Sequence, residues 1–290
     1  MFPTFAWLDR VNRSRGRQPL PRRCGATVAG TVAAIVNTIV ALGWGDNAAA
    51  VVSAPLVEEA MKGAGILWAV RRREVDGVMD GIVYAGWVAL GFAVVEDFTY
   101  FADAASGGML LPIFILRALL TPFAHPLFTS WTGLAVGLAV ARGRSVVPAL
   151  LWGYPLAVAC HAAWNGSLVY AESTGDTAAI WVAYLCFVAL FLAAIVTVIL
   201  IRQHQRRQFE QAVPMLAARY GIPPHEAQVF ARWREMLRAR RRLNRSQRRH
   251  FDAVHASLAR LALLHARPGP LSGADEQRLA EQLQRARTGR

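Results

Sequence analysis

The sequence predicts an all-α, polytopic membrane protein with about six transmembrane helices and a helical, basic C-terminal tail. The first observation is composition: 54% of the 290 residues are hydrophobic, and the mean hydropathy is +0.29. The second is that the apolar residues form continuous blocks of about 18 residues or more, the length at which a helix crosses a bilayer. The third is an abrupt change after residue 201, where the chain becomes polar and rich in arginine.

The apolar blocks predict the order of the elements along the chain. Spans are expected at residues 26–43, 48–70, 78–101, 112–140, 146–169 and 178–201. Pro112, Pro122 and Pro126 interrupt the fourth span, because proline removes a backbone donor and clashes with the preceding turn. The domains are therefore a basic N-terminal segment (1–25), a six-helix membrane domain (26–201) and an arginine-rich helical tail (202–290).

Charge in the loops predicts the orientation. Arginines precede the first span, Arg71 to Arg73 follow the second, and Arg142 and Arg144 follow the fourth. The alternate loops, near Asp46, Asp103 and residues 172–176, contain no lysine or arginine. Under the positive-inside rule, both termini are cytoplasmic in a multi-pass protein of the inner (plasma) membrane.

Ionisable and polar side chains lie inside four of the predicted spans. An ionisable group there costs about 2.5–3.5 kcal/mol even on the mildest insertion scales, so such groups face protein or water and mark functional sites. The group comprises Glu58, Glu59, Lys62, Asp80, Glu96, Asp97, Arg117, His125, His161 and Asn165.

Counting residues from the predicted span ends places several of these side chains at similar depths. At 1.5 Å per residue, Glu58 lies about 15 Å and Glu96 about 9 Å below the outer face. On the same basis His161 lies about 13 Å and Asn165 about 8 Å deep. Three helices thus bring polar groups to the same outer half of the bilayer, which predicts one shared site.

Spacing within the helices adds detail. Lys62 is four residues from Glu58 and three from Glu59, so it is placed to pair with either carboxylate. Consecutive residues do not share a helix face, so one glutamate is expected to face the site while the other pairs with Lys62 or caps a neighbouring helix. His161 and Asn165, four residues apart, project together.

Purely structural roles compete with chemistry at several positions. Asp80 suits an interfacial helix cap, and Asp97 suits solvation of the outer end of its helix. Arg117 suits a counter-ion to Glu96 or Asp97, or a side chain that snorkels to the interface. His125 alone suits a satisfied core histidine. An ion- or proton-coupled carrier would also use buried carboxylates, but carriers often show inverted repeats, and this sequence has none that we recognise.

Four short motifs occur in order between about residues 50 and 170. Glu58 to Lys62 fits EExxK, and His161 to Asn165 fits HxxxN. Between them lie Asp80-Gly81, the run Gly91 to Asp97 that fits GFAxxEN except for Asp97, and His125 before an apolar helix. Together they resemble the PrsW family of intramembrane proteases, which is similar to the CAAX-processing and bacteriocin-processing membrane proteases.

The resemblance implies a reaction and a partner. Glu58 or Glu59 with His125 would activate water, Glu96 would belong to the catalytic group, and His161 with Asn165 would stabilise the oxyanion. The substrate would be a single-span membrane protein, such as an anti-sigma factor, cut near the outer membrane face. The wider group has no clear need for a metal, which implies no cofactor.

Zinc is the alternative mechanism. Glu58, Glu96, His125 and His161 are acceptable ligands, and bound zinc makes water a nucleophile at neutral pH. The sequence contains no HExxH motif, so the metal-free route is preferred here.

The tail contains 19 arginines against 7 acidic residues, a balance of +12 out of the chain's +13. Pro223-Pro224 predicts the start of an arginine-rich helical stretch to about Leu243. Anionic lipid headgroups are the expected partner of such a cationic segment beside a membrane. A solvated helical surface would show the same pattern. The tail has no recognisable nucleic-acid-binding module, so nucleic acid is not expected.

Overall fold

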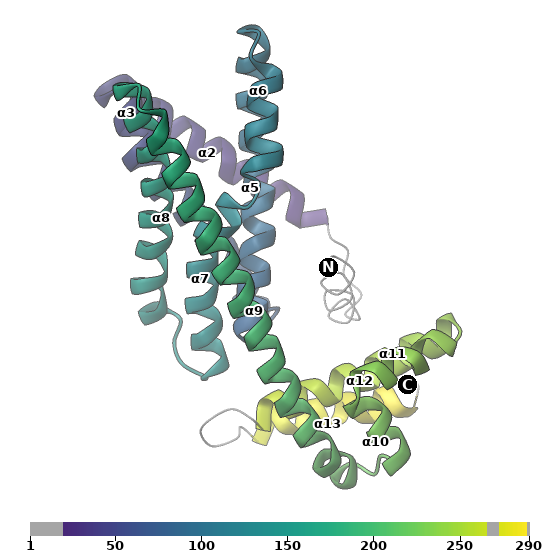
Figure 1. Cartoon of the computed structure of the whole chain (residues 1–290). Helices are drawn as coiled ribbons and strands as arrows, with labels where there is room; N and C mark the ends of the chain where they lie inside the picture. Colours follow the sequence, from purple (N-terminus) through teal and green to yellow (C-terminus); the bar gives the residue numbers. More distant parts are fainter. Residues whose placement is uncertain (1–19, 266–272, 289–290) are drawn as a thin grey trace. The chain divides into compact units, whose positions relative to one another are not determined.

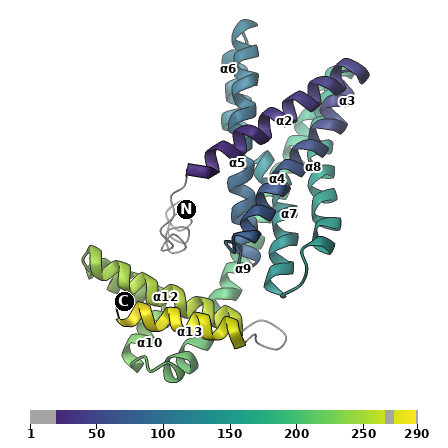
Figure 2. The same ribbon diagram turned by 180° about the vertical axis from the view of Figure 1, so that it is seen from behind.

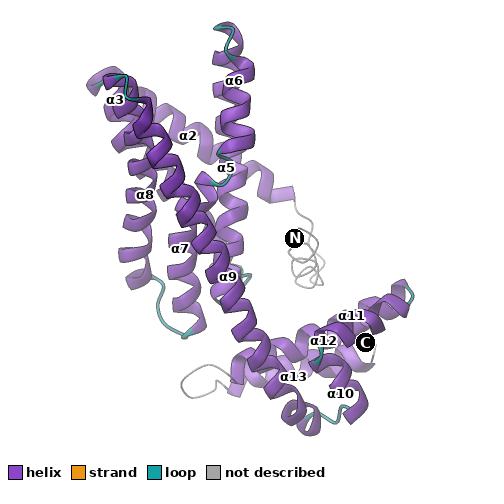
Figure 3. Ribbon diagram, viewed as in Figure 1, coloured by secondary structure: helices purple, strands orange, loops and turns teal. Residues whose placement is uncertain are grey.

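The computed structural model of the chain describes residues 20–265 and 273–288, with side chains from Gly30 onward. All regular structure in these ranges is helical, and they contain no strand (Figure 3). The contacts between residues divide the described chain into two compact units, a membrane unit that extends to Val198 and a tail unit that begins at Ile199. Residues 1–19 of the predicted N-terminal segment lie outside the described ranges, and the first helix begins at Leu20, inside that segment.

The membrane unit consists of helices that cover all six predicted spans (Figures 1 and 2). In chain order they are α2 (Leu20–Trp44), α3 (Asp46–Ala48), the π-helix η1 (Ala49–Ser53), α4 (Ala54–Arg71), α5 (Val78–Ser106), α6 (Leu110–Phe114), the π-helix η2 (Ile115–Leu120), α7 (Ala124–Ala141), α8 (Val147–Thr174) and the first part of α9 (Thr177–Arg219).

Three of these segments are long and apolar enough to cross a membrane by length and composition. They are Val78–Ser106, Leu110–Ala141 and Thr177–Arg219, and Gly30–Trp44 is a shorter apolar helix. The second of them is not one straight helix, because a break at residues 121–123 separates η2 from α7 where the sequence has Pro122. The structure is thus an all-α membrane protein, and six spans remain the prediction of the sequence.

Glycines allow α5 and α7 to approach closely. A Cβ added at Gly81 would collide with the carbonyl oxygen of Gly133, and one at Gly137 would lie 2.8 Å from Val78 Cα. Gly153 of α8 faces α7 in the same way, because its added Cβ would lie 3.0 Å from Trp131 O. Small residues at these positions bring the backbones of α5, α7 and α8 together around the polar side chains.

The outer surface of the membrane unit is apolar. Leu42, Phe98, Leu151 and Trp181 are all more than 60% exposed, and the apolar window of α9 has no buried residue. α9 contacts the bundle through Phe187, Leu190 and Phe191, which pack against Leu127 and Phe128 of α7. An exposed apolar surface of this kind fits a lipid environment rather than water.

The tail unit is a separate small helical domain. It contains the end of α9, followed by α10 (Pro224–Ala231), α11 (Trp233–Arg242), α12 (Arg245–His265) and α13 (Gly273–Thr288). Its core is apolar and includes Leu216, Phe230, Leu258, Leu261 and Leu283.

One boundary differs from that expected. α9 continues as one helix to Arg219, well past residue 201, where the apolar pattern ends. The arginine-rich stretch after Pro223 is helical as expected, and it consists of two helices because Arg232 adopts an extended conformation between α10 and α11. With this break, Phe230 on α10 and Met236 on α11 are both buried.

Candidate active site

The predicted polar residues converge from four helices of the membrane unit. α4 supplies Glu58, Glu59 and Lys62, α7 supplies His125, α8 supplies His161, and α5 supplies Glu96. Glu59 and Lys62 are fully buried, and Glu58 and His161 are 5% and 2% exposed. Residues 102 positions apart in the chain are therefore neighbours in one buried cluster.

Lys62 lies at the centre of this cluster. Its Nζ is 2.8 Å from Glu59 Oε1, 3.4 Å from Glu58 Oε2 and 3.1 Å from His125 Nδ1. The Nζ also lies 4.7 Å from the centroid of the Phe92 ring, a cation–π contact. The predicted pairing of Lys62 with the neighbouring carboxylates is present for both of them, because the long side chain runs back along the helix and reaches the i−3 and the i−4 residue.

Glu59 is held by three neighbours. Besides Lys62, Thr129 Oγ1 donates to its Oε2 at 2.8 Å, and His161 Nδ1 lies 3.2 Å from its Oε1. The His161 ring also stacks on Phe128, with centroids 4.9 Å apart. A carboxylate on one ring nitrogen fixes the orientation of the imidazole and leaves Nε2 to face the site.

His125 is oriented by a second chain of contacts. Its Nε2 lies 2.9 Å from Glu96 Oε2, and Arg117 NH2 lies 3.1 Å from Glu96 Oε1. Arg117 also donates through Nε to Asp97, and its guanidinium covers the Tyr100 ring at 3.9 Å. Arg117 is thus a counter-ion to both acidic residues, which confirms the role suggested by their charges.

Two predicted residues lie at the edge of the arrangement or outside it. Asn165 Nδ2 donates to the carbonyl oxygen of Ala50 in η1 at 2.8 Å. Asp80 lies in the first turn of α5 and accepts a hydrogen bond from Asp76 N–H at 3.1 Å. This contact at the start of the helix fits the structural role that competed with chemistry. Asp80 lies 16 residues before Glu96, about 24 Å along the helix, and so outside the cluster.

Sequence analysis missed two residues that hold the cluster together. They are Thr129 and Phe128, on the same helix as His125. Thr129 follows His125 by four residues, so helical periodicity places the two on one face, and this spacing could have indicated Thr129. Phe128 had no comparable signal, because an aromatic residue in an apolar span is expected to be lipid-facing or core.

Three side chains of the cluster have the geometry of a metal-ligand group. Glu58, His125 and His161 each offer one ligand atom, and these atoms lie within 4.8 Å of one another. Two imidazole nitrogens and a carboxylate oxygen form a ligand set that catalytic zinc sites use. Each histidine also contacts a further carboxylate, Glu59 or Glu96, as zinc-bound histidines commonly do. The residues present fit zinc by donor type and by the carboxylate contacts of the histidines. Lys62 Nζ lies 3.1 Å from His125 Nδ1 and 3.4 Å from Glu58 Oε2, so this ammonium group neighbours two of the three ligand residues.

The fold and the site together define a class: a helical membrane protein with a buried carboxylate–imidazole centre suited to hydrolysis. A comparison with known proteins identifies the family. The model described as "PrsW family intramembrane metalloprotease" matches residues 23–201, more than half of the chain, and the protein belongs to this family. No curated protein and no solved structure gives a match. The resemblance inferred from the four motifs is confirmed, and the protein is an intramembrane protease.

Proposed function

We propose that the protein hydrolyses a peptide bond of a single-span membrane protein, such as an anti-sigma factor, near the outer face of the inner membrane. The observation that carries this proposal is the convergence of Glu58, His125 and His161 on one buried point. The depths expected for Glu58, Glu96 and His161 favour a cut in the outer half of the bilayer when both termini are cytoplasmic. Membership of a protease family favours hydrolysis over an ion-coupled carrier.

The contacts distinguish the two adjacent glutamates. Glu59 contacts Lys62, Thr129 and His161, so its two oxygens are already engaged. Glu58 contacts Lys62 at the longer distance of 3.4 Å and belongs to the metal-ligand group. Glu58 is therefore the carboxylate of the reacting centre, and Glu59 is a positioning residue that orients His161.

Zinc would be held by Glu58, His125 and His161. When bound, it would polarise the scissile carbonyl and supply a water nucleophile at neutral pH. The convergence of these three side chains supports zinc over the metal-free route that the missing HExxH motif favoured. It also revises the ligand set expected from the sequence, because Glu96 contacts His125 and Arg117 instead of completing the group.

The remaining polar residues orient the reacting groups, balance their charge or donate hydrogen bonds. Glu96 orients His125, and Lys62 balances the charge of the buried Glu58 and Glu59 carboxylates. Because His161 belongs to the metal-ligand group, Asn165 is the residue that we propose as oxyanion donor. Its amide carries two N–H bonds, of which one donates to Ala50 O.

Metal content and cleavage of a single-span substrate test this proposal together. Purified full-length protein is expected to contain about one zinc per chain by elemental analysis, in line with one ligand group. Glu58→Ala and His161→Ala should lose both the zinc and the cleavage. His250→Ala, an exposed histidine of the tail, should retain both.

The outcomes separate the alternatives. Full cleavage by zinc-free protein, abolished by Glu58→Ala, would restore the metal-free route. Ion-gradient-driven uptake without cleavage would instead indicate a carrier.

A further inference from the structure

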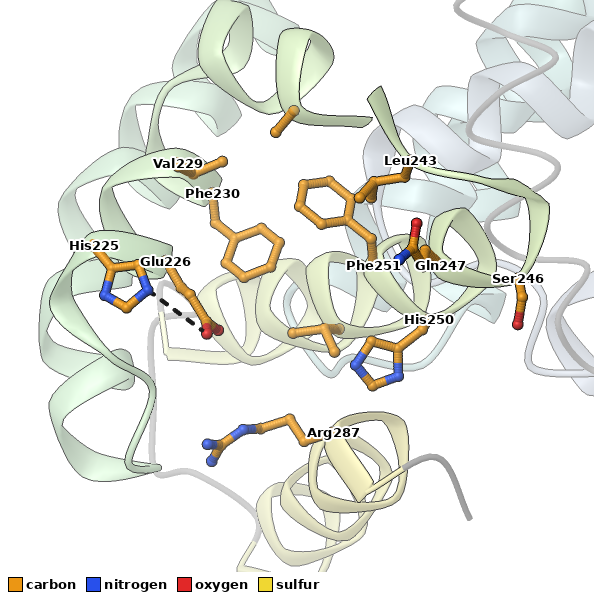
Figure 4. Close-up of a pocket in the computed structure, with 12 residues that line it drawn as sticks. His225, Glu226, Val229, Phe230, Leu243, Ser246, Gln247, His250, Phe251 and Arg287 are labelled. Carbon is orange, nitrogen blue, oxygen red and sulfur yellow. Dashed lines mark ion pairs between the residues drawn. The ribbon is translucent and has the colours of Figure 1, made fainter. Parts of the chain in front are cut away.

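The tail unit contains a pocket that the proteolytic site does not use. It has a volume of about 720 Å³ and lies between α10, α11, α12 and α13. Its floor is apolar, and Phe230 and Phe251 point toward each other there with ring centroids 4.9 Å apart (Figure 4). Val229, Ala239, Leu243 and Val254 complete the apolar lining. Phe230 and Val254 also belong to the hydrophobic core of the tail, so the floor of the pocket is continuous with that core.

The edges of the pocket are polar. His225 and Glu226 lie at the α10 side, with His225 Nε2 4.0 Å from Glu226 Oε1, and Gln247 and His250 lie on α12 (Figure 4). Arg287 lines the pocket with its stem, because its guanidinium donates to the carbonyl oxygens of Tyr220 and Gly221. The volume is within the ~300–1,000 Å³ typical of ligand sites.

Three exposed arginines are adjacent in the sequence to residues that line the pocket. Arg242 precedes the lining residue Leu243, Arg245 precedes Ser246, and Arg249 precedes His250, and all three arginines are exposed. They differ from Arg240, whose guanidinium makes two hydrogen bonds to Asp252 at 2.6 and 2.7 Å. With 19 arginines against 7 acidic residues, the tail favours a ligand that carries negative charge.

The shape and surface of the tail favour a peptide over a lipid surface. A lipid headgroup layer is broad and needs no apolar hollow, whereas an amphipathic helix inserts apolar side chains into one. Among the described residues from 202 onward, Met215 is the one large hydrophobic residue whose side chain is exposed. The described tail therefore offers an apolar pocket and no apolar face to insert into a membrane.

We propose that the tail is a docking module for an acidic, amphipathic helical segment of a partner protein. Apolar side chains of that segment, spaced three or four residues apart, enter the pocket over Phe230 and Phe251. Its carboxylates face Arg242, Arg245 and Arg249. This module is independent of the proteolytic site. The Glu58→Ala variant, which should not cleave, is therefore expected to bind the acidic segment as the wild type does.

The probe is a displayed library of random 16-residue peptides, selected on full-length protein in neutral phosphatidylcholine nanodiscs. Enriched peptides are expected to combine aspartate or glutamate with leucine or an aromatic residue at helical spacing. Affinities of the enriched peptides are then measured by fluorescence anisotropy. Ala239→Trp, which fills the pocket, should weaken binding at least 10-fold.

Charge reversals at exposed arginines test the electrostatic part of the proposal without changing the apolar core. Arg242→Glu with Arg249→Glu should also weaken binding at least 10-fold. Arg278→Glu, on α13 and outside the pocket lining, should change it less than 3-fold. Circular dichroism of each variant checks that the helices remain folded.

Two results would overturn the proposal. One is enrichment of peptides without acidic residues, or binding that survives both Ala239→Trp and the double reversal. The other is that only phosphatidylglycerol vesicles bind, with equal losses for the pocket reversals and Arg278→Glu, which would make the tail a lipid-binding surface.

Discussion

Thr129 shows how one hydroxyl contributes to the cluster. It is fully buried and donates to Glu59, the carboxylate that orients His161. A buried acceptor that loses its donor costs about 1–3 kcal/mol. Thr129→Val should therefore lower the free energy of unfolding by about that amount and reduce turnover. Thr129→Ser, which keeps the hydroxyl, should remain near wild type.

Thr132 is the matched control on the same helix. Its side chain is also fully buried, but its hydroxyl makes no hydrogen bond within the described residues. Replacing it with valine removes an unsatisfied group, so Thr132→Val should be neutral or stabilising. Thermal unfolding in detergent compares the variants, and equal stability of Thr129→Val and wild type would contradict the role given to Thr129.

At the scale of elements, the π-helix η1 is tied to two neighbouring helices. Asn165 of α8 donates to Ala50 O, and Ser53 Oγ donates to Asn37 Oδ1 of α2 at 2.8 Å. π-Helical turns often mark functional sites, and this one leads directly into the helix that contains Glu58.

The two ties are expected to differ in function. If Asn165 donates to the oxyanion, Asn165→Ala should reduce turnover per folded molecule about 10²–10³-fold with little change in substrate binding. Ser53→Ala should affect only stability, since an interhelical hydrogen bond in a membrane is worth about 0.6–2 kcal/mol. Kinetics normalised to folded protein measure both. If the two variants behave alike, Asn165 only holds η1.

The contact between α5 and α7 depends on glycine at specific positions. A Cβ at Gly81 meets the backbone of Gly133 and Gly137, so Gly81→Ala forces the helices apart. Overpacking of this kind typically costs about 1–3 kcal/mol. Gly86→Ala, on the same helix with nothing within 4 Å of the added Cβ, should be tolerated or stabilising, because alanine favours helix. Melting temperatures in detergent test this pair, and equal destabilisation would refute the close-contact explanation.

At the scale of the whole molecule, we expect pH to change the stability of the tail unit through the protonation of His255. Burial lowers the pKa of His255 to about 4, against the opposing influence of Asp252, and its ring packs near Phe209 and Phe230. In the unfolded chain a histidine pKa is near ~6.5. Between these values the unfolded state binds a proton that the folded state does not, so stability falls as pH falls, by up to about 3 kcal/mol.

Hydrogen exchange of α12 in the full-length protein, corrected for intrinsic rates, measures this dependence between pH 7.5 and pH 5. His255→Leu removes the titrating group and should flatten the profile. His250→Leu, at an exposed position of the same helix, should leave it unchanged. An unchanged slope in His255→Leu would show that another group is responsible.

Much of this protein could be predicted from local patterns in its sequence. Long apolar blocks fixed the all-α membrane class, because a helix is the one regular structure that satisfies its own backbone in lipid over a single segment. Glu58, Lys62, His125 and His161 could be selected because charged or polar groups are costly there. The order of the four motifs indicated the family that the comparison confirmed.

Other features depend on contacts between distant segments, and only the tertiary structure decided them. The sequence could not show that Lys62 contacts both glutamates at once, or that Thr129 donates a hydrogen bond to Glu59. It also could not show that Glu96 contacts His125, while Glu58, His125 and His161 form the converging group. The pocket in the tail likewise depends on residues of α10, α11, α12 and α13 that are distant in the sequence. The physical reason is that burial cost and helical period act within one segment, whereas a site is made by side chains from four helices whose relative rotation is set by packing.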